Sequence, residues 1–129
     1  ILDPFCGTGG ILLEAGLCGI QTFGTDTKKE MVKGTRKNLE KYGILAHDIR
    51  QIDAEKSLKK FKNIDAIITD LPYGKASKVD GKTEEKFLNL IEYFNDRTIF
   101  MYDKPRLGEF EADFEIYIHK SLTRYVYVI

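Results

Sequence analysis

The sequence predicts an open, mostly parallel α/β sheet that carries helices on both of its faces. Three observations support this fold class. Short apolar runs alternate with stretches of helical periodicity, a glycine-rich turn follows the first apolar run, and two adjacent apolar runs close the chain. A chain of 129 residues has the size of one domain and enough apolar side chains for a core of its own.

The first half of the chain provides three strands and two helices. We expect the end of a strand at Ile1 and Leu2, a helix over 10–18, a strand over 20–25, a helix that stops at Gly43, and a strand over 44–47. The helical residues expected to face the core are Ile11, Ala15 and Cys18 in the first helix and Val32, Thr35, Leu39 and Tyr42 in the second. Asp26 or Thr27 can cap the start of the second helix, and Gly43 suits the left-handed conformation that ends one.

The second half continues the alternation. We expect a small amphipathic helix over 54–61, a strand over 64–69, a helix with an apolar stripe at Phe87, Leu90, Ile91 and Phe94, and strands over 98–102, 114–118 and 125–129. The run 64–69 is nearly all apolar, which is typical of a strand buried on both faces of a parallel sheet. The tight connection between the last two strands predicts an antiparallel pair at the sheet edge. Residues 74–83 are polar and rich in Lys and Gly, and we expect a mobile loop there.

The composition excludes several classes of protein. No apolar run approaches the length of a membrane span and no basic-then-apolar leader opens the chain, so we expect a cytoplasmic protein without a membrane partner. Cys6 and Cys18 lie too far apart for a zinc or redox pair, so we expect no metal. Basic and acidic residues balance at 20 each, whereas a domain that grips nucleic acid by itself usually carries a basic excess. If the substrate is a polynucleotide, much of its affinity must come from elsewhere.

The start of the chain bears on its domain organisation. Ile1 and Leu2 resemble the end of a strand whose beginning is missing. We therefore expect residues 1–129 to be one catalytic domain of a longer protein, truncated within its first strand.

Four of the expected strands end at an aspartate. These residues are Asp3, Asp26, Asp48 and Asp70. In open α/β sheets, ligands bind outside the carboxyl ends of the strands, so the four carboxylates are expected to face one site. Any one of them alone could be a helix cap or part of an exposed turn. Their common register with the sheet, beside a glycine-rich turn, favours a cofactor site.

The turn DPFCGTGG, residues 3–10, indicates the class of cofactor. Gly7, Gly9 and Gly10 permit positive φ and let backbone N–H groups approach a ligand. The pattern is not GxGxxG and no Gly-Lys-Ser/Thr follows, so neither a dinucleotide loop nor a phosphate loop is indicated. Asp3 at the head of the turn would repel a pyrophosphate.

These carboxylates suit S-adenosylmethionine, which has an ammonium, a sulfonium and a ribose but no phosphate. Asp26 lies about twenty residues after the turn, where a carboxylate bonds the ribose hydroxyls of a nucleoside cofactor. Asp48, at the end of the next expected strand, would reach the adenine edge.

The stretch DLPYG, residues 70–74, points to the substrate. Pro72 restricts Leu71 to an extended conformation, so that the Leu71 carbonyl becomes a fixed hydrogen-bond acceptor. Tyr73 offers a flat ring for stacking, and Asp70 offers a carboxylate. Two acceptors and a stacking ring match an exocyclic amine on a planar base.

Such an amine needs help to react, because its lone pair is delocalised into the base. Hydrogen bonds to Asp70 and to the Leu71 carbonyl would turn the lone pair toward a methyl group, and the carboxylate would stabilise the positive charge that develops on nitrogen. Positioning for in-line displacement would supply the rest of the rate. The alternative interpretation of DLPYG is a strand end followed by an ordinary turn.

Taken together, these motifs resemble tRNA guanosine N2-methyltransferases, most of all the archaeal-type enzymes that modify guanosine at position ten. The similar stretches are DPFCGTGGILLEAG, GTD before MVKGTRKNLEKYG, DAIITDLPYGKAS and HKSLTR, and they span essentially the whole chain. The resemblance implies a class I, Rossmann-like methyltransferase fold, S-adenosylmethionine as donor and transfer to the N2 amine of guanine in tRNA. It assigns cofactor contacts to Asp3, Cys6, Gly7, Gly9, Asp26 and Asp48, and the target-amine role to Asp70 and Tyr73.

Two features depart from that family. Its members usually read Asp-Pro-Pro-Tyr, and Leu71 here replaces the first proline while keeping the carbonyl. The family also carries an upstream RNA-binding THUMP module, which this chain lacks. We therefore expect tRNA to be bound mainly through a module outside the chain.

Basic residues near the expected target pocket are candidates for RNA contacts. If the strand before HKSLTR is parallel to the central strands, this turn lies on the cofactor side of the sheet, where His119, Lys120 and Arg124 could meet phosphates. The alternative is a solvated hairpin turn. Lys75, after DLPYG, could likewise contact RNA or solvent.

Two other functions remain open from the sequence. The strand-end motif also suits an amino-methyltransferase that acts on DNA adenine or another planar amine. A non-catalytic, cofactor-binding scaffold subunit is the second alternative, although an intact DLPY motif would serve no purpose in it.

Overall fold

The computed structural model describes residues 1–45, 47–72 and 81–129, so the predictions for Tyr73, Lys75 and most of the loop 74–83 lie outside the described residues. Its elements, in chain order, are β1 (Leu2–Asp3), α1 (Gly10–Leu17), β2 (Thr22–Asp26), α2 (Lys29–Lys41), β3 (His47–Gln51), α3 (Ala54–Lys60), β4 (Ile67–Asp70), α4 (Gly81–Phe94), β5 (Thr98–Tyr102), β6 (Arg106–Leu107), β7 (Phe110–Glu111), β8 (Phe114–His119) and β9 (Leu122–Val128). Within these ranges, no helix combines the length and apolarity that a bilayer crossing requires.

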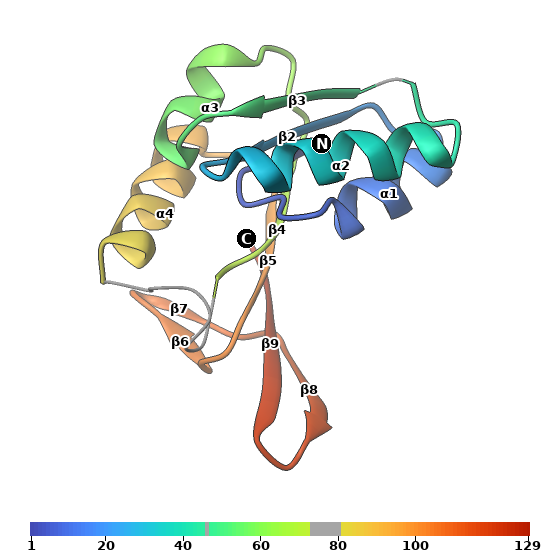
Figure 1. Cartoon of the computed structure of the whole chain (residues 1–129). Helices are drawn as coiled ribbons and strands as arrows, with labels where there is room; N and C mark the ends of the chain where they lie inside the picture. Colours follow the sequence, from blue (N-terminus) through green and yellow to red (C-terminus); the bar gives the residue numbers. More distant parts are fainter. Residues whose placement is uncertain (46, 73–80) are drawn as a thin grey trace.

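The main sheet has seven strands in the order β3-β2-β1-β4-β5-β9-β8 (Figure 1). The first five strands in this order are parallel, whereas β9 runs antiparallel to both β5 and β8. This arrangement confirms the predicted α/β sheet with an antiparallel edge pair. The strand order reverses direction between β1 and β4, and such a switch point is where open α/β sheets bind ligands.

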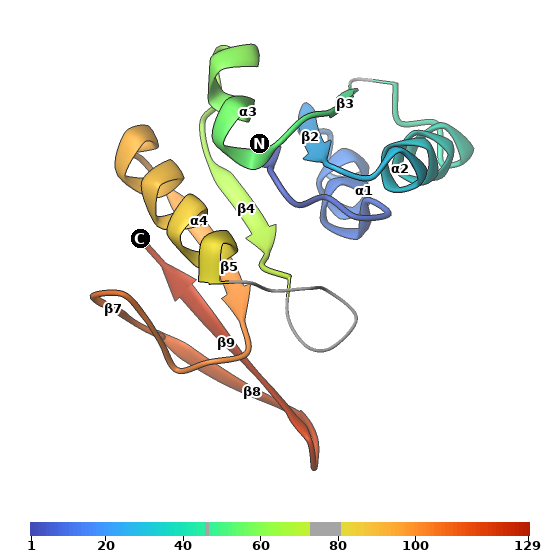
Figure 2. The same ribbon diagram turned by 60° about the vertical axis from the view of Figure 1, so that its left-hand side comes forward.

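Helices cover both faces of the sheet (Figure 2). On one face, α1 and α2 bury Leu12, Val32 and Leu39 against Ile49 of β3. On the other face, α3 and α4 enclose a larger cluster that is rich in aromatic rings. The β8–β9 hairpin extends beyond both helical layers (Figure 1).

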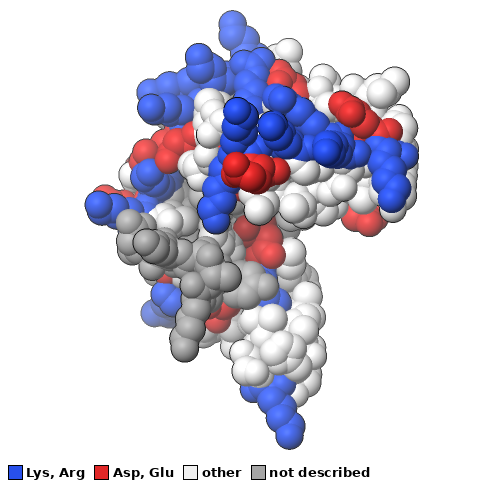
Figure 3. All heavy atoms as spheres, in the orientation of Figure 1, with Lys and Arg blue, Asp and Glu red and all other residues white. Residues whose placement is uncertain are grey.

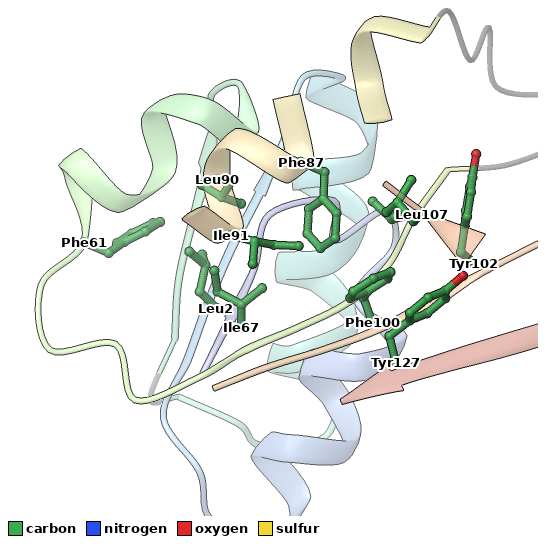
Figure 4. Packing of buried hydrophobic residues seen from close by; sticks show 11 residues of the cluster. Leu2, Phe61, Ile67, Phe87, Leu90, Ile91, Phe100, Tyr102, Leu107 and Tyr127 are labelled. Atoms are coloured by element: carbon green, nitrogen blue, oxygen red, sulfur yellow. The ribbon is translucent and has the colours of Figure 1, made fainter. Parts of the chain in front are cut away.

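The larger cluster fixes the position of β4 and β5. The ring centroids of Phe87 and Phe100 lie 4.9 Å apart at an edge-to-face angle, and Phe100 stacks on Tyr127 of β9 at 4.3 Å (Figure 4). All three rings are fully buried. Burying one such side chain stabilises the fold by roughly 1.5–3 kcal/mol, so this cluster anchors the strand end that carries Asp70.

The first helix packs on a face other than the predicted one. Cys18 is exposed and follows the helix, while Ile11 and Ala15 are only partly buried. Leu12 is fully buried because Gly24 of β2 leaves room for it: a Cβ on Gly24 would lie 2.5 Å from Leu12 Cδ1.

The third strand begins later than predicted, at His47 instead of 44. Gly43 adopts φ 71° and ends α2 as predicted, but the Ile44 N–H then donates to the Leu39 carbonyl at 2.9 Å. Ile44 is buried against α1 and α2, so it belongs to the end of the helix and not to the sheet. Two further differences are that α4 begins at Gly81, inside the predicted loop, and that the short β6–β7 hairpin was not predicted.

Candidate active site

A cavity of about 720 Å³ opens at the carboxyl ends of the parallel strands. Its lining includes Gly7, Asp26, Asp53, Asp70, Pro72 and Lys86. A second hollow of about 750 Å³ lies between α4 and the β6–β7 hairpin, beside the amino end of β5. The first cavity holds the strand-end carboxylates at the topological switch point, so we assign the functional site to it.

The glycine-rich turn forms one wall of this cavity and is tied down by hydrogen bonds. The Cys6 N–H donates to the Thr25 carbonyl at 2.9 Å, and the Thr35 hydroxyl donates to the Gly7 carbonyl at 2.8 Å. Gly9 has φ 87°, and a Cβ there would lie 2.7 Å from Thr35 Cγ2. Gly9 therefore serves the close packing of the turn on α2.

Asp26 closes β2 as predicted and lines the cavity. Its Oδ2 accepts from the Gly7 N–H at 3.1 Å and its Oδ1 from the Lys28 N–H at 2.8 Å. These two backbone donors join the glycine-rich turn to the start of α2 and hold the carboxylate at the rim of the cavity.

Asp3 and Cys6 lie beneath the turn and are not among the residues that line the cavity. Asp3 is buried and accepts hydrogen bonds from the Thr69 hydroxyl at 2.6 Å and the Phe5 N–H at 3.1 Å. Burial raises the pKa of the Asp3 carboxyl to about 7 and, together with the nearby Asp3 charge, raises the pKa of the Cys6 thiol to about 12. Asp3 therefore supports the site from below, and Cys6 is a buried thiol.

The prediction that Asp48 closes the third strand was wrong. Because β3 begins at His47, Asp48 pairs in register with Phe23, near the amino end of β2. Its carboxylate forms a bidentate ion pair with Arg50, with a shorter contact of 2.6 Å, and lies outside the residues that line the cavity.

Asp53 lies where Asp48 was expected, in the cavity beyond the carboxyl end of β3. Its Oδ1 caps α3 by accepting from the Glu55 N–H at 3.1 Å, and its Oδ2 pairs with Lys86 Nζ at 2.8 Å. Burial opposes ionisation, but the hydrogen bonds from Lys86 and the Glu55 N–H lower the pKa of the Asp53 carboxyl. Its place directly before an amphipathic helix was the signal in the sequence that could have identified it.

Asp70 ends β4 and faces the same cavity. Leu71 is buried and donates its N–H to the Met101 carbonyl at 3.0 Å, so the sheet ladder continues past the strand end. Pro72 lines the cavity. The first part of the DLPY motif thus presents a carboxylate and a constrained backbone to the site.

Arg124 is not placed to meet phosphates, so that prediction was wrong. Its side chain is only 7% exposed, and its guanidinium forms an ion pair with Oδ1 of Asp70. His119 and Lys120 are exposed at the β8–β9 turn, where the Ser121 N–H donates to His119 Nδ1 at 3.3 Å. Because β8 runs parallel to the central strands, this turn lies at the carboxyl edge of the sheet.

The described side chains supply no group of three or more His, Cys, Asp or Glu residues that could hold a metal ion. The arrangement instead offers three carboxylates, Asp26, Asp53 and Asp70, around one cavity. Lys28 and Lys86 line the same cavity, so it offers both acceptors and donors to a polar ligand.

Comparisons with known proteins identify the family of the chain. The pattern of a family described as "RMKL-like, methyltransferase domain" matches residues 1–98. A tRNA (guanine(10)-N2)-dimethyltransferase of Methanocaldococcus jannaschii is 39% identical over 99% of this chain and 40% of its own length. A protein of Methanothermococcus thermolithotrophicus, named "Probable tRNA (guanine(10)-N2)-dimethyltransferase", is 38% identical over 99% of this chain and 86% of its own length.

The fold also matches solved methyltransferase structures. The RNA methyltransferase from Salinibacter ruber, crystallised with S-adenosyl-L-homocysteine, superposes with a TM-score of 0.69 at 17% identity over 99% of this chain and 78% of that one. The chain spans less than half the length of several curated relatives, including the Methanocaldococcus jannaschii protein at 40%. The class I methyltransferase fold and the family predicted from the motifs are thereby confirmed. The chain belongs to the RMKL-like methyltransferase domain family, as a relative of the tRNA (guanine(10)-N2)-dimethyltransferases.

Proposed function

We propose that this chain is the catalytic domain of an S-adenosylmethionine-dependent enzyme that methylates the exocyclic N2 amine of a guanosine in tRNA. The observation that carries the proposal is the position of Asp70. It ends the buried strand β4 and faces the same cavity as Asp26 and Asp53. A carboxylate that accepts from a target amine then lies beside the carboxylates that would bind a methyl donor.

The cavity fits the proposed cofactor in charge and in hydrogen-bonding groups. Asp26, held by two backbone N–H groups, would accept the ribose hydroxyls, and Asp53 would face the adenine edge. The carboxylates would attract the ammonium and the sulfonium. When bound, the cofactor supplies an activated methyl group on its sulfonium.

The residues of the chain would orient the substrate amine for in-line attack. Asp70 and the Leu71 carbonyl would accept the two N–H bonds, which turns the nitrogen lone pair toward the methyl carbon. The nitrogen would take the methyl group while sulfur keeps the electron pair of the carbon–sulfur bond, and the proton lost by nitrogen would pass to the Asp70 carboxylate. The Asp70 carboxylate would stabilise the positive charge that develops on nitrogen. Tyr73 would stack on the base; it lies outside the described residues.

Two observations favour RNA as the substrate. The curated relatives are named for guanine-10 of tRNA. In addition, the balanced charge of the chain conceals a strong asymmetry, because residues 28–62 hold eleven Lys and Arg but only five Asp and Glu. All eleven cations are exposed, and they gather over α2, β3 and α3 (Figure 3). We name the cations of residues 28–62 the basic face; it could meet the phosphate backbone, with further affinity from the rest of the full-length protein.

The test is to incubate the full-length protein with labelled S-adenosylmethionine and, separately, unmodified tRNA, duplex DNA or protein, and to identify the modified nucleoside after digestion. We expect N2-methylated guanosine in tRNA and no label in the other substrates. Asp70→Ala should abolish transfer and leave the cofactor dissociation constant within about threefold, since Asp70 serves the amine and not the donor. Label confined to DNA adenine, or full turnover of Asp70→Ala, would overturn the proposal.

A further inference from the structure

The ion pair between Arg124 and Asp70 bridges three strands of the sheet. Asp70 of β4 pairs in register with Met101 of β5, and Met101 pairs with Val126 of β9. These residues therefore share one face of the sheet, and Arg124, two residues before Val126, lies on the same face. From there its guanidinium crosses β5 to reach Oδ1 of Asp70.

The two partners differ in exposure. The Arg124 side chain is 7% exposed, whereas that of Asp70 is 38% exposed. The contacted oxygen, Oδ1, is itself buried. The exposed part of the side chain therefore lies away from Oδ1, and Asp70 lines the cavity.

Fold stability alone does not explain a buried cation at this position. Removing a guanidinium from water costs several kcal/mol, and apolar residues of similar volume often replace buried ion pairs without loss of stability. Burial also lowers the pKa of Arg124, in keeping with this desolvation. The pair instead fixes the orientation of one carboxylate at the end of the central strand.

We propose that Arg124 is a positioning residue for the amine-binding carboxylate of Asp70. It holds Oδ1 and thereby directs the rest of the carboxylate toward the target amine. This inference rests on the proposed function, because it gives Arg124 a role in the same methyl transfer. It replaces the phosphate contact expected for this arginine, since a guanidinium engaged below the surface is not available to the RNA backbone.

The test compares Arg124→Met, Arg124→Lys and Arg124→Gln in the full-length protein, with steady-state kinetics on tRNA, calorimetric cofactor binding and thermal unfolding. Arg124→Met should lower kcat by about 10- to 100-fold, because small errors in position cost that much, while the cofactor dissociation constant and the KM for tRNA stay within about twofold. Arg124→Lys should recover part of kcat and Arg124→Gln should not, because only Lys can restore the charge. Arg106→Met is the matched control: Arg106 pairs with Glu111 on the surface, with side chains 67% and 70% exposed.

Combining the substitutions separates positioning from a structural role. In an Asp70→Asn background, Arg124→Met should lower the residual kcat by less than about twofold, because there is no carboxylate left to position. If Arg124→Met lowers kcat equally in both backgrounds, or if Lys and Gln behave alike, the inference is wrong. If Arg124→Met does not fold, the comparison of Arg124→Lys with Arg124→Gln still tests the inference.

The outcomes also distinguish this inference from the proposed function. Normal turnover of Asp70→Asn would overturn the assignment of the amine site to Asp70, and with it the proposed function. A strongly reduced kcat in Asp70→Asn, together with a fully active Arg124→Met, would overturn only the role of Arg124.

Discussion

The hydroxyl of Thr69 donates a 2.6 Å hydrogen bond to the carboxylate of Asp3, and both side chains are buried. The bond joins β4 to β1 across the switch point, directly beneath the cavity. It puts an ionisable group in a place where water cannot solvate its charge, and the first prediction follows from this.

Asp3 should make the stability of the protein fall as the pH rises. Burial raises its pKa from 3.8 to about 7 in the folded state, so between these values the folded state binds the proton that the unfolded chain has lost. Stability due to this group is therefore greatest at low pH and is lost as the pH rises through about 7. Asp3→Asn should remove that loss, which amounts to at most about 4 kcal/mol.

Urea unfolding of both proteins at pH 4.5, 6 and 8 measures this effect. The difference in unfolding free energy, variant minus wild type, should increase with pH. Parallel pH dependences would show that Asp3 ionises as readily in the folded protein as in the unfolded chain.

The glycine-rich turn gives a second prediction, which concerns stability. Gly9→Ala should destabilise the protein by about 1–3 kcal/mol, because φ 87° is costly for a residue with a Cβ and the new atom would overlap Thr35. Gly10 is the matched control. It begins α1, has no atom within 4 Å of an added Cβ, and should accept Ala with no loss of stability. Equal midpoints of thermal unfolding for the two variants would contradict this account of the turn.

The third prediction concerns the finding that Asp53, and not Asp48, lines the cavity. Asp53→Asn should weaken cofactor binding about tenfold, or roughly 1.4 kcal/mol, as expected for a lost hydrogen bond to a charged group. Asp48→Asn should leave the dissociation constant within about twofold, because its carboxylate pairs with Arg50 outside the cavity. Calorimetry with S-adenosyl-L-homocysteine measures both, and a larger loss for Asp48 would restore the assignment made from the sequence.

The sequence predicted the central strands correctly because their apolar runs are strong local signals. The run 64–69 overlaps β4, which spans Ile67–Asp70, and 98–102 matches β5 residue for residue. The third strand lacks such a signal: its residues read HDIRQ and only Ile49 is buried. It is a strand because β2 lies beside it and pairs with it, and this pairing is not visible in local sequence. Because the start of this strand was predicted too early, Asp48 was expected at the cavity in place of Asp53.

Arg124 shows a second limit of sequence reasoning. Charged side chains are rarely buried, so an arginine near a hairpin turn is reasonably expected at the surface. Its burial depends on the register of β9 against β5 and of β5 against β4, which brings it diagonally opposite Asp70. The residues of a motif can be identified from sequence, whereas a partner from a distant strand follows only from the register.

The basic face gives the fourth prediction, which rests on tRNA as the substrate. Lys37 of α2 and Lys59 of α3 are both exposed, and neither is part of an ion pair within the described residues. Changing both to Glu should weaken tRNA binding by the full-length protein about tenfold and reduce the slope of log K against log salt by about 1 to 2, because phosphate contacts are lost. The control variant Arg97→Glu with Arg106→Glu changes the net charge equally but lies outside the basic face. Fluorescence anisotropy from 50 to 200 mM salt measures both variants. Equal losses of affinity would mean that total charge, and not the basic face, determines how tightly tRNA is held.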